Sequence, residues 1–420
     1  MAKLVYEGNR VIFTKEMKKE YKILIPSMAP YHFDFFVDIL ESEGYQTEIL
    51  QNHSFDLIHE GLKYSHNDIC VPAMLVIGQF IDAIKSDNYD IHKTAVMISQ
   101  TGGGCRASNY LSLIRKAFIK AGYEFIPIIS FNSVGLESNP GFKISTRMIF
   151  KLTNSLIFGD ILMQIVNEKI PYEVNKGETM RVYKEAHKQL AKSVSYNDLR
   201  AWLQPKKLID KVIKRFSEIE VDRTVLKPKI GIVGEIYVKY SPLGNNNLEQ
   251  LLRNEGCEVV TPSIFDFFLY TFDSAAYDVS HYGGKKLSRF KNLATVAFVE
   301  KRKKVVANIL DKYGFTKPLS YKEIKAFTKG FISHGTHVGE GWLLTAEMVH
   351  LIHSDVPNIV CAQPFGCLPN HIAGKGMIKR IKDNFPESNI VTIDYDTSAT
   401  EINQLNRIRL MLANAKKNMK

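Results

Sequence analysis

The chain is poor in cysteine, with five in 420 residues, and none of the five forms a closely spaced pair. Zinc sites and ferredoxin-type cluster sites usually show such pairs, so neither motif is present. A small, odd number of thiols in so long a chain also argues against a disulfide framework. The sequence therefore favours free thiols in a reducing compartment.

Long apolar runs are also missing. No stretch reaches the roughly 18 uninterrupted apolar residues of a membrane-spanning helix, so we expect no membrane span. The first residues, MAKLVYEGNRVIFTKEMKKE, carry charges throughout and have no apolar core of the kind that a secretory signal needs. We therefore expect a cytoplasmic protein.

Two further absences restrict the class of ligand. The formal net charge is +11, but the lysines are dispersed and no motif of a known nucleic-acid-binding fold occurs, so no nucleic-acid partner is expected. The glycines at 102–104 are not followed by the Lys-Ser/Thr of a phosphate-binding loop, and no other nucleotide-binding signature is found. An acidic partner protein or an anionic ligand explains the charge equally well.

What the chain does contain is a repeated series of buried strand, loop and helix. Such a series predicts an α/β protein with two flavodoxin/Rossmann-like lobes and parallel sheets. We predict an N-terminal lobe over 1–170, a helical connector over 171–225 and a C-terminal lobe over 226–420. The predicted strands are 21–27, 46–50, 94–99, 125–130, 229–233, 259–262, 359–360 and 390–394.

Two segments receive local predictions that the structure can test directly. Residues 234–247 are rich in Gly, Pro and Asn and are predicted to form a loop. Residues 285–314 are predicted to form a pair of basic helices, which would suit an acidic partner.

Four of the five cysteines lie near strand ends or helix starts. Cys70 precedes a helix, Cys105 lies between a strand and a helix, Cys361 is placed at a strand end, and Cys367 follows it in a loop. Open α/β sheets bind ligands beyond the carboxyl ends of their strands, so we predict that these thiols meet in the cleft between the lobes. Helix N-termini are expected to lower their pKa. Cys257 lies at the opposite end of its strand and is interpreted as structural.

Other interpretations of the thiols remain open from the residues alone. They are compatible with ordinary buried cysteines, with a zinc site, or with a nucleophile, although no Cys–His pairing stands out. His334, His337 and Glu340 resemble an acid–base or metal set, while loop histidines usually have no such role.

Six stretches together carry a resemblance to a known family. The chain resembles the 2-hydroxyacyl-CoA dehydratase and benzoyl-CoA reductase superfamily, and within it the CoA-substrate-specific enzyme activase-related branch, which includes the double-cubane cluster proteins. The stretches run over nearly the whole chain: HNDICVPA (66–73), TGGGCRASNY (101–110), GEIYVKYSPLGNNN (234–247), EGWLLTAEM (340–348), CAQPFGCLPNHIAGKGMI (361–378) and IDYDTSATEINQLNRI (393–408).

The resemblance implies an iron–sulfur cluster, of the [4Fe–4S] or double-cubane type, held by cysteines of both lobes. Cys70, Cys105 and Cys367 match the family's cluster motifs, and Cys361 matches a cysteine that is frequent in this branch. It also implies a homodimer and a separate ATP-hydrolysing activator with an actin/Hsp70-like fold, which delivers a low-potential electron. This chain lacks the ATPase domains of the large members, so the activator is expected in trans.

The leading hypothesis is an iron–sulfur protein that reduces a small substrate at its cluster. The first alternative is a 2-hydroxyacyl-CoA dehydratase that removes a hydroxyl group through a radical of the acyl-CoA. The second is a non-catalytic electron relay or scaffold. The resemblance identifies no catalytic side chain beyond the cluster ligands.

Overall fold

The computed structural model describes residues 2–54, 56–100, 104–131, 137–195, 205–396 and 401–419. It begins with a small hairpin, in which β1 (Tyr6–Glu7) pairs antiparallel with β2 (Arg10–Val11). Gly8 in its turn has a φ of +62°, a conformation that glycine adopts without strain. A short helix, α1 (Met17–Glu20), leads into the first lobe.

The N-terminal lobe contains a four-stranded sheet with the order β4-β3-β5-β6, and all its neighbouring strands are parallel. Buried residues such as Ile23 and Ala95 lie side by side on its central strands. The strands are β3 (Lys22–Ile25), β4 (Gln46–Ile49), β5 (Thr94–Ser99) and β6 (Ile128–Phe131). The helices are α2 (Pro30–Ser42), α3 (Asp56–Tyr64), α4 (Val71–Lys85) and α5 (Tyr110–Ala121).

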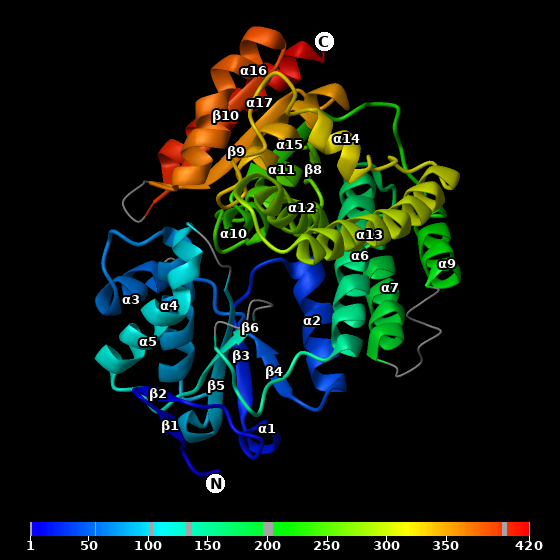
Figure 1. Ribbon diagram of the computed structural model, residues 1–420. Coiled ribbons are helices and arrows are strands. Elements are labelled where there is room, and N and C mark those ends of the chain that lie inside the picture. Colours follow the sequence, from blue (N-terminus) through cyan, green and yellow to red (C-terminus); the bar gives the residue numbers. More distant parts are fainter. Residues whose placement is uncertain are drawn as a thin grey trace.

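The C-terminal lobe repeats this arrangement with the order β10-β9-β7-β8, again all parallel. Both sheets thus have the chain's second, first, third and fourth strands in spatial order, which is the flavodoxin-like order. The strands are β7 (Lys229–Gly234), β8 (Glu258–Val260), β9 (Asn358–Pro364) and β10 (Asn389–Tyr395). The predicted fold class, α/β with two Rossmann-like lobes, is confirmed (Figure 1).

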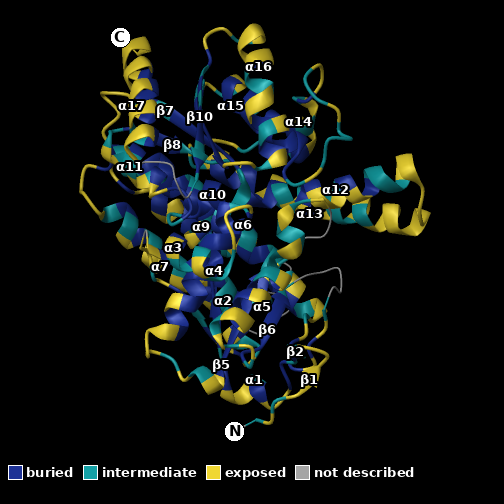
Figure 2. Ribbon diagram, turned by 90° about the vertical axis from the view of Figure 1, so that its left-hand side faces the viewer, coloured by how far each residue is buried: buried dark blue, intermediate teal, exposed yellow. Residues whose placement is uncertain are grey.

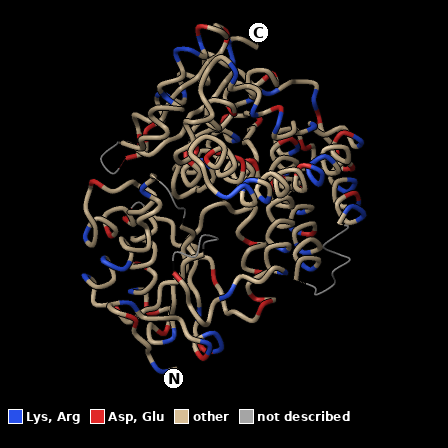
Figure 3. Tube along the Cα trace, viewed as in Figure 1, with Lys and Arg blue, Asp and Glu red and all other residues tan. Residues whose placement is uncertain are grey.

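Helices cover the sheets, so the strands lie in the buried interior of Figure 2. The helices of the C-terminal lobe are α10 (Ile236–Tyr240), α11 (Leu248–Asn254), α12 (Ile264–Tyr282), α13 (Lys286–Lys312), α14 (Tyr321–Ala326), α15 (Trp342–His353), α16 (Ile378–Asn384) and α17 (Glu401–Asn418). Lys and Arg residues are dispersed along the whole chain, as the sequence indicates (Figure 3).

Two local predictions are wrong. Residues 285–314 form one continuous helix, α13, because no Gly or Pro interrupts it and its buried side chains, Val299, Val306 and Leu310, keep helical spacing. It packs against α12, and together they project from the molecule (Figure 2). The predicted loop at 234–247 contains α10, because the Glu235 side chain caps its start by accepting a hydrogen bond from Val238 N at 2.8 Å.

The predicted connector contains α7 (Glu178–Ser195) and α9 (Lys206–Ser217), and follows the long helix α6 (Thr146–Lys169). α6 packs against α2 and α7 and also against β8 and α12, so it contacts both lobes (Figure 1). The predicted boundaries at 170 and 225 stay predictions. Among the described helices, α6 with the turn that follows it is the one long and apolar enough to cross a membrane. Of its most apolar window, 61% is buried, so it serves as a core helix.

Asp160 of α6 joins the lobes through four hydrogen bonds. Its Oδ1 lies 2.9 Å from His32 Nε2 of α2 and accepts from Ile264 N at 3.0 Å. Its Oδ2 accepts from Ser263 Oγ at 2.5 Å and from Phe265 N at 3.2 Å, at the start of α12. Although burial opposes ionisation, these hydrogen bonds and the neighbouring His32 hold the pKa of Asp160 below its usual value.

We expect Asp160→Asn to lower the free energy of unfolding by about 3 kcal/mol, because an amide nitrogen cannot accept from the backbone and the partners stay buried. The lowered pKa means that the carboxylate stabilises the fold above its usual pKa of 3.8 and ceases to do so as the pH falls through the lowered value. Thermal melting between pH 3 and 7 should therefore show a difference between the proteins that shrinks toward low pH. Asp383→Asn, in an exposed pair with Lys379, is the control and should change little; equal effects of both would contradict the role of Asp160.

Candidate functional site

Three of the predicted cysteines lie beyond the carboxyl ends of central strands or at helix starts. Cys70 is the N-cap of α4, and its carbonyl oxygen accepts from Ala73 N at 3.0 Å. Cys105 follows β5 and begins the 3-10 turn Arg106–Asn109 that leads into α5. Cys367 follows β9, and its carbonyl oxygen accepts from His371 N at 2.9 Å. These placements agree with the sequence prediction.

A close crossing of α3 and α4 positions Cys70. Gly61 and Gly78 face the opposite helix backbone: a Cβ on Gly61 would lie 2.1 Å from the Met74 carbonyl oxygen, and one on Gly78 would lie 1.9 Å from the Leu57 carbonyl oxygen. Any larger residue would push the helices apart. The start of α4 is thereby held against its neighbour.

The two lobes meet at these thiols. Glu235, which follows β7, and Glu340, which precedes α15, both act electrostatically on the Cys105 thiol of the N-terminal lobe. The same two carboxyl groups act on the thiol of Cys367 in the C-terminal lobe. Cys70 interacts with both Cys105 and Glu235. We call these five residues the thiol–carboxyl cluster; they come from five separate segments of both lobes.

Hydrogen bonds connect the carboxyl groups to the surrounding backbone. Glu340 Oε1 accepts from Ile236 N at 3.0 Å, and Glu340 Oε2 accepts from Asn370 Nδ2 at 3.3 Å. Asn370 Nδ2 also donates to Cys367 Sγ at 3.3 Å. Glu340 therefore ties the loop after β7 to the loop after β9, and both loops end strands that pair with each other.

In the N-terminal lobe, the Tyr110 hydroxyl lies 3.1 Å from Cys70 Sγ. Burial raises the pKa of Tyr110 well above its usual value, and the nearby Cys70 and Glu235 raise it further, so the hydroxyl keeps its proton. It is therefore the donor to a Cys70 thiolate.

Burial outweighs the helix N-termini in setting the acidity of these thiols. It raises the pKa of Cys105 to about 11, with Glu340 and Glu235 adding to the rise, and it raises the pKa of Cys70 and Cys367 as well. Our prediction of lowered pKa values is therefore wrong for the protein by itself. Burial likewise raises the pKa of Glu235, and repulsion from Glu340 raises it further. The cluster favours neutral groups unless a cation lies among them.

Cys361 is not where the sequence places it. It lies in the middle of β9, opposite Thr392 and Val233, and is fully buried. The short apolar run Ile359–Val360 is only the first half of a seven-residue strand. The Cys361 sulfur faces the Gly374 backbone, and a Cβ there would lie 3.3 Å from it. The structure does not bring Cys361 beside the other three thiols, and its role as a ligand stays a prediction.

Of the remaining candidate residues, most lie outside the thiol–carboxyl cluster. Cys257 is buried just before β8, at the opposite edge of the sheet, which agrees with its structural interpretation. His334 Nε2 lies 2.7 Å from Thr328 Oγ1, and His337 Nε2 pairs with Asp278 Oδ1 at 2.8 Å. Of the His334, His337 and Glu340 set, Glu340 alone belongs to the thiol–carboxyl cluster.

Sequence reasoning missed Glu235, Tyr110 and Asn370. Glu235 comes directly after a predicted strand, so the strand-end rule that selected Cys105 also applies to it. Tyr110 and Asn370 lie within the stretches quoted for the resemblance, but nothing in their spacing distinguishes them from ordinary polar residues.

The side chains of the thiol–carboxyl cluster suit some kinds of metal site better than others. In the described part of the chain, no three His, Cys, Asp or Glu side chains are arranged around a single ion, so the zinc alternative gains no support. The ligands of an iron–sulfur cluster bind separate iron atoms and stand further apart, and thiolates are their usual donors. Three thiols from two lobes fit that requirement in kind.

No protein-family model matches the chain, and no curated protein matches it in sequence.

In protein prepared without iron, we expect Cys105 to be alkylated at pH 8 at least about tenfold more slowly than a free cysteine, because so little of it is thiolate. Since the pKa of Cys105 is about 11, the rate should keep rising up to about pH 10. Iodoacetamide labelling followed by peptide mass spectrometry measures this rate, with the denatured chain as control. A rate that levels off near pH 8 would contradict the raised pKa.

Proposed function

We propose that this protein is an iron–sulfur protein that receives a low-potential electron from an ATP-hydrolysing activator and reduces a small substrate. The single supporting observation is that Cys70, Cys105 and Cys367, far apart in the chain, all interact electrostatically with Glu235 where the lobes meet. Cavities beyond the carboxyl ends of parallel strands are where such folds place their chemistry. The proposal matches the activity implied by the resemblance to the 2-hydroxyacyl-CoA dehydratase superfamily.

In the proposed holoprotein, these three cysteines hold the cluster. Bound there, an iron–sulfur cluster supplies one-electron transfer, with a potential set by hydrogen bonds to sulfur and by burial. Tyr110 and Asn370 donate the hydrogen bonds to the sulfurs of Cys70 and Cys367. Three thiolates leave one iron of a [4Fe–4S] cluster without a protein sulfur, and there a substrate would bind.

The carboxyl groups have a separate role in this proposal. Burial and repulsion from Glu340 raise the pKa of Glu235 to about 8, so the pair of carboxyl groups holds a proton near neutral pH. Reduction of a small molecule consumes protons as well as electrons. In this proposal, Glu235 and Glu340 supply that proton beside the thiols.

The proposal also includes the partners. The sequence offers no nucleotide-binding signature, so ATP hydrolysis is assigned to a separate activator, of the actin/Hsp70-like type. The resemblance implies a homodimer. We propose that it is cytoplasmic, because free thiols and an oxygen-sensitive cluster both require a reducing compartment.

The decisive measurement is iron and acid-labile sulfide after isolation without oxygen. We expect about four iron atoms per chain, with Cys105→Ala and Cys367→Ala each losing most of the iron and the brown colour. Cys257→Ala is the matched control and should keep both, because that thiol lies at the opposite edge of the sheet. Circular dichroism verifies that each variant is folded. A colourless, iron-free wild-type protein would refute the proposal, as would a folded Cys105→Ala variant with undiminished iron.

A second experiment decides between reduction and its rivals. The iron-loaded protein is mixed with an activator and ATP and given acetylene, azide or a 2-hydroxyacyl-CoA. Reduction of acetylene or azide supports the proposed function. Turnover of the hydroxyacyl-CoA alone identifies a dehydratase instead, and electron transfer to a dye without turnover of any substrate identifies a relay.

A further inference from the structure

A second concave site lies away from the thiol–carboxyl cluster, between the residues that follow α6 and the helix α11. Its volume is about 420 Å³, within the range of small-molecule sites. Lys227 lies just before β7, and Gly256 and Cys257 lie just before β8, so the pocket is at the amino-terminal edge of the C-terminal sheet. Glu235 follows the other end of β7, roughly 20 Å away at about 3.3 Å per residue.

The charges that line the pocket are mostly positive. Lys176, Lys227 and Arg253 contribute three cations, and Glu173 is the one carboxyl group among the lining residues. Glu173 accepts from Gly177 N at 2.7 Å and from Thr179 N at 2.8 Å, at the start of α7. Burial alone would raise the pKa of Glu173, but these hydrogen bonds lower it. The Glu173 carboxylate is therefore ionised and already hydrogen-bonded to the backbone.

Arg253 is the most constrained of the cations. Its side chain is 13% exposed, pairs with Glu249 at 2.6 Å and donates to the Tyr31 hydroxyl at 3.0 Å and to Asn167 Oδ1. Its Nε is buried and has no hydrogen-bond partner among the described residues. A buried guanidinium N–H without an acceptor is costly, and a bound anion would satisfy it.

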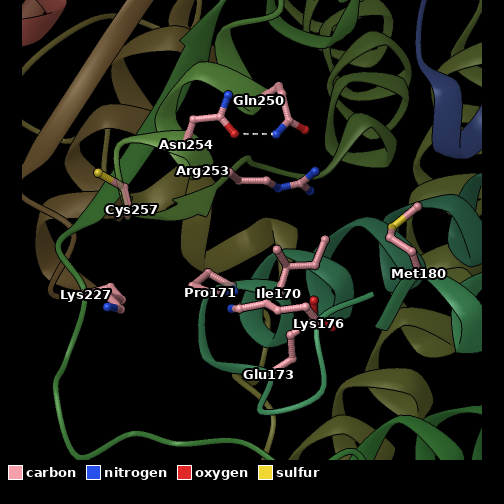
Figure 4. Close-up of a pocket in the computed structure, with 11 residues that line it drawn as sticks. Ile170, Pro171, Glu173, Lys176, Met180, Lys227, Gln250, Arg253, Asn254 and Cys257 are labelled. Carbon is pink, nitrogen blue, oxygen red and sulfur yellow. Dashed lines mark hydrogen bonds between the residues drawn. The ribbon is translucent and has the colours of Figure 1, made fainter. Parts of the chain in front are cut away.

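Apolar side chains form part of the wall that faces Arg253. Figure 4 shows Arg253 on one side, with Ile170, Pro171 and Lys176 on the facing side, and the Cys257 sulfur directed away. Met180 completes the apolar part. In the described part of the chain, the ammonium groups of Lys176 and Lys227 form no ion pair. A pocket that combines three cations with apolar side chains suits an anion that carries an organic group.

We propose that this pocket binds a small organic phosphate, with the phosphate between Lys176, Lys227 and Arg253 and the organic part against Ile170, Pro171 and Met180. Phosphate is favoured because a guanidinium N–H and two ammonium groups can donate to its several oxygens at once. This site is separate from the thiols, so the inference does not depend on the proposed function.

Isothermal titration of the full chain at low ionic strength tests the inference, with adenosine 5′-monophosphate, ribose 5-phosphate and succinate as probes. We expect at least one phosphate to bind with a Kd of about 1 mM or tighter. The double variant Lys176→Gln/Lys227→Gln should weaken that binding at least about tenfold, because two charge-assisted hydrogen bonds are lost.

Lys286→Gln/Lys304→Gln is the matched control, since it removes the same charge from two exposed lysines of α13 and should bind as the wild type does. Both double variants should melt at the wild-type temperature. The inference is overturned if neither phosphate binds, if the two double variants bind equally, or if succinate binds more tightly than both phosphates. Titration with and without iron in the protein keeps this result distinct from the outcome for the thiol–carboxyl cluster.

Discussion

The relation between the two lobes depends on one buried carboxylate, Asp160 of α6. Helix α6 contacts both lobes, but helix packing alone permits sliding. Asp160 adds direction, because it holds His32 of the first lobe and the start of α12 in the second through four hydrogen bonds. In any other arrangement of the lobes, the carboxylate of Asp160 would lose these hydrogen-bond donors, which is energetically costly. The contact therefore favours one arrangement. In that arrangement the loops that follow β5, β7 and β9 reach one another.

The site that results is electrostatically unfavourable for the protein by itself. Burial pushes the thiols and both carboxyl groups toward their neutral forms, although the backbone and Asn370 satisfy Glu340. A fold gains nothing in stability from gathering three thiols and two carboxyl groups where water is scarce. Such local conflict is typical of functional sites, where the cost is offset by packing elsewhere. A cationic group among these side chains would reverse the balance by favouring their ionised forms.

Much of this architecture could be predicted from strand and helix patterns. The strand-end rule placed Cys105 and Cys367 correctly, because carboxyl ends of parallel strands share one edge, and the signal for a helix start placed Cys70. It failed for Cys361, since a short apolar run does not reveal that β9 continues to Pro364. The strand-end rule also does not show how the two lobes face each other. For that reason the interaction between Glu235 and Glu340 could not be predicted. The acidity of the thiols was predicted in the wrong direction because a helix start is visible in a sequence and burial is not.

The two sites occupy opposite ends of the same strand, and this has a structural reason. At the carboxyl end of β7, residues of the two lobes come together around the three thiols. At its amino end, α11 and the residues that follow α6 line a pocket with charged side chains. Arg253 links this pocket to the lobe junction, because it donates to Tyr31 of α2 and Asn167 of α6. An anion held by Arg253 would therefore add to the contacts between the lobes and stabilise the arrangement that brings the thiols together.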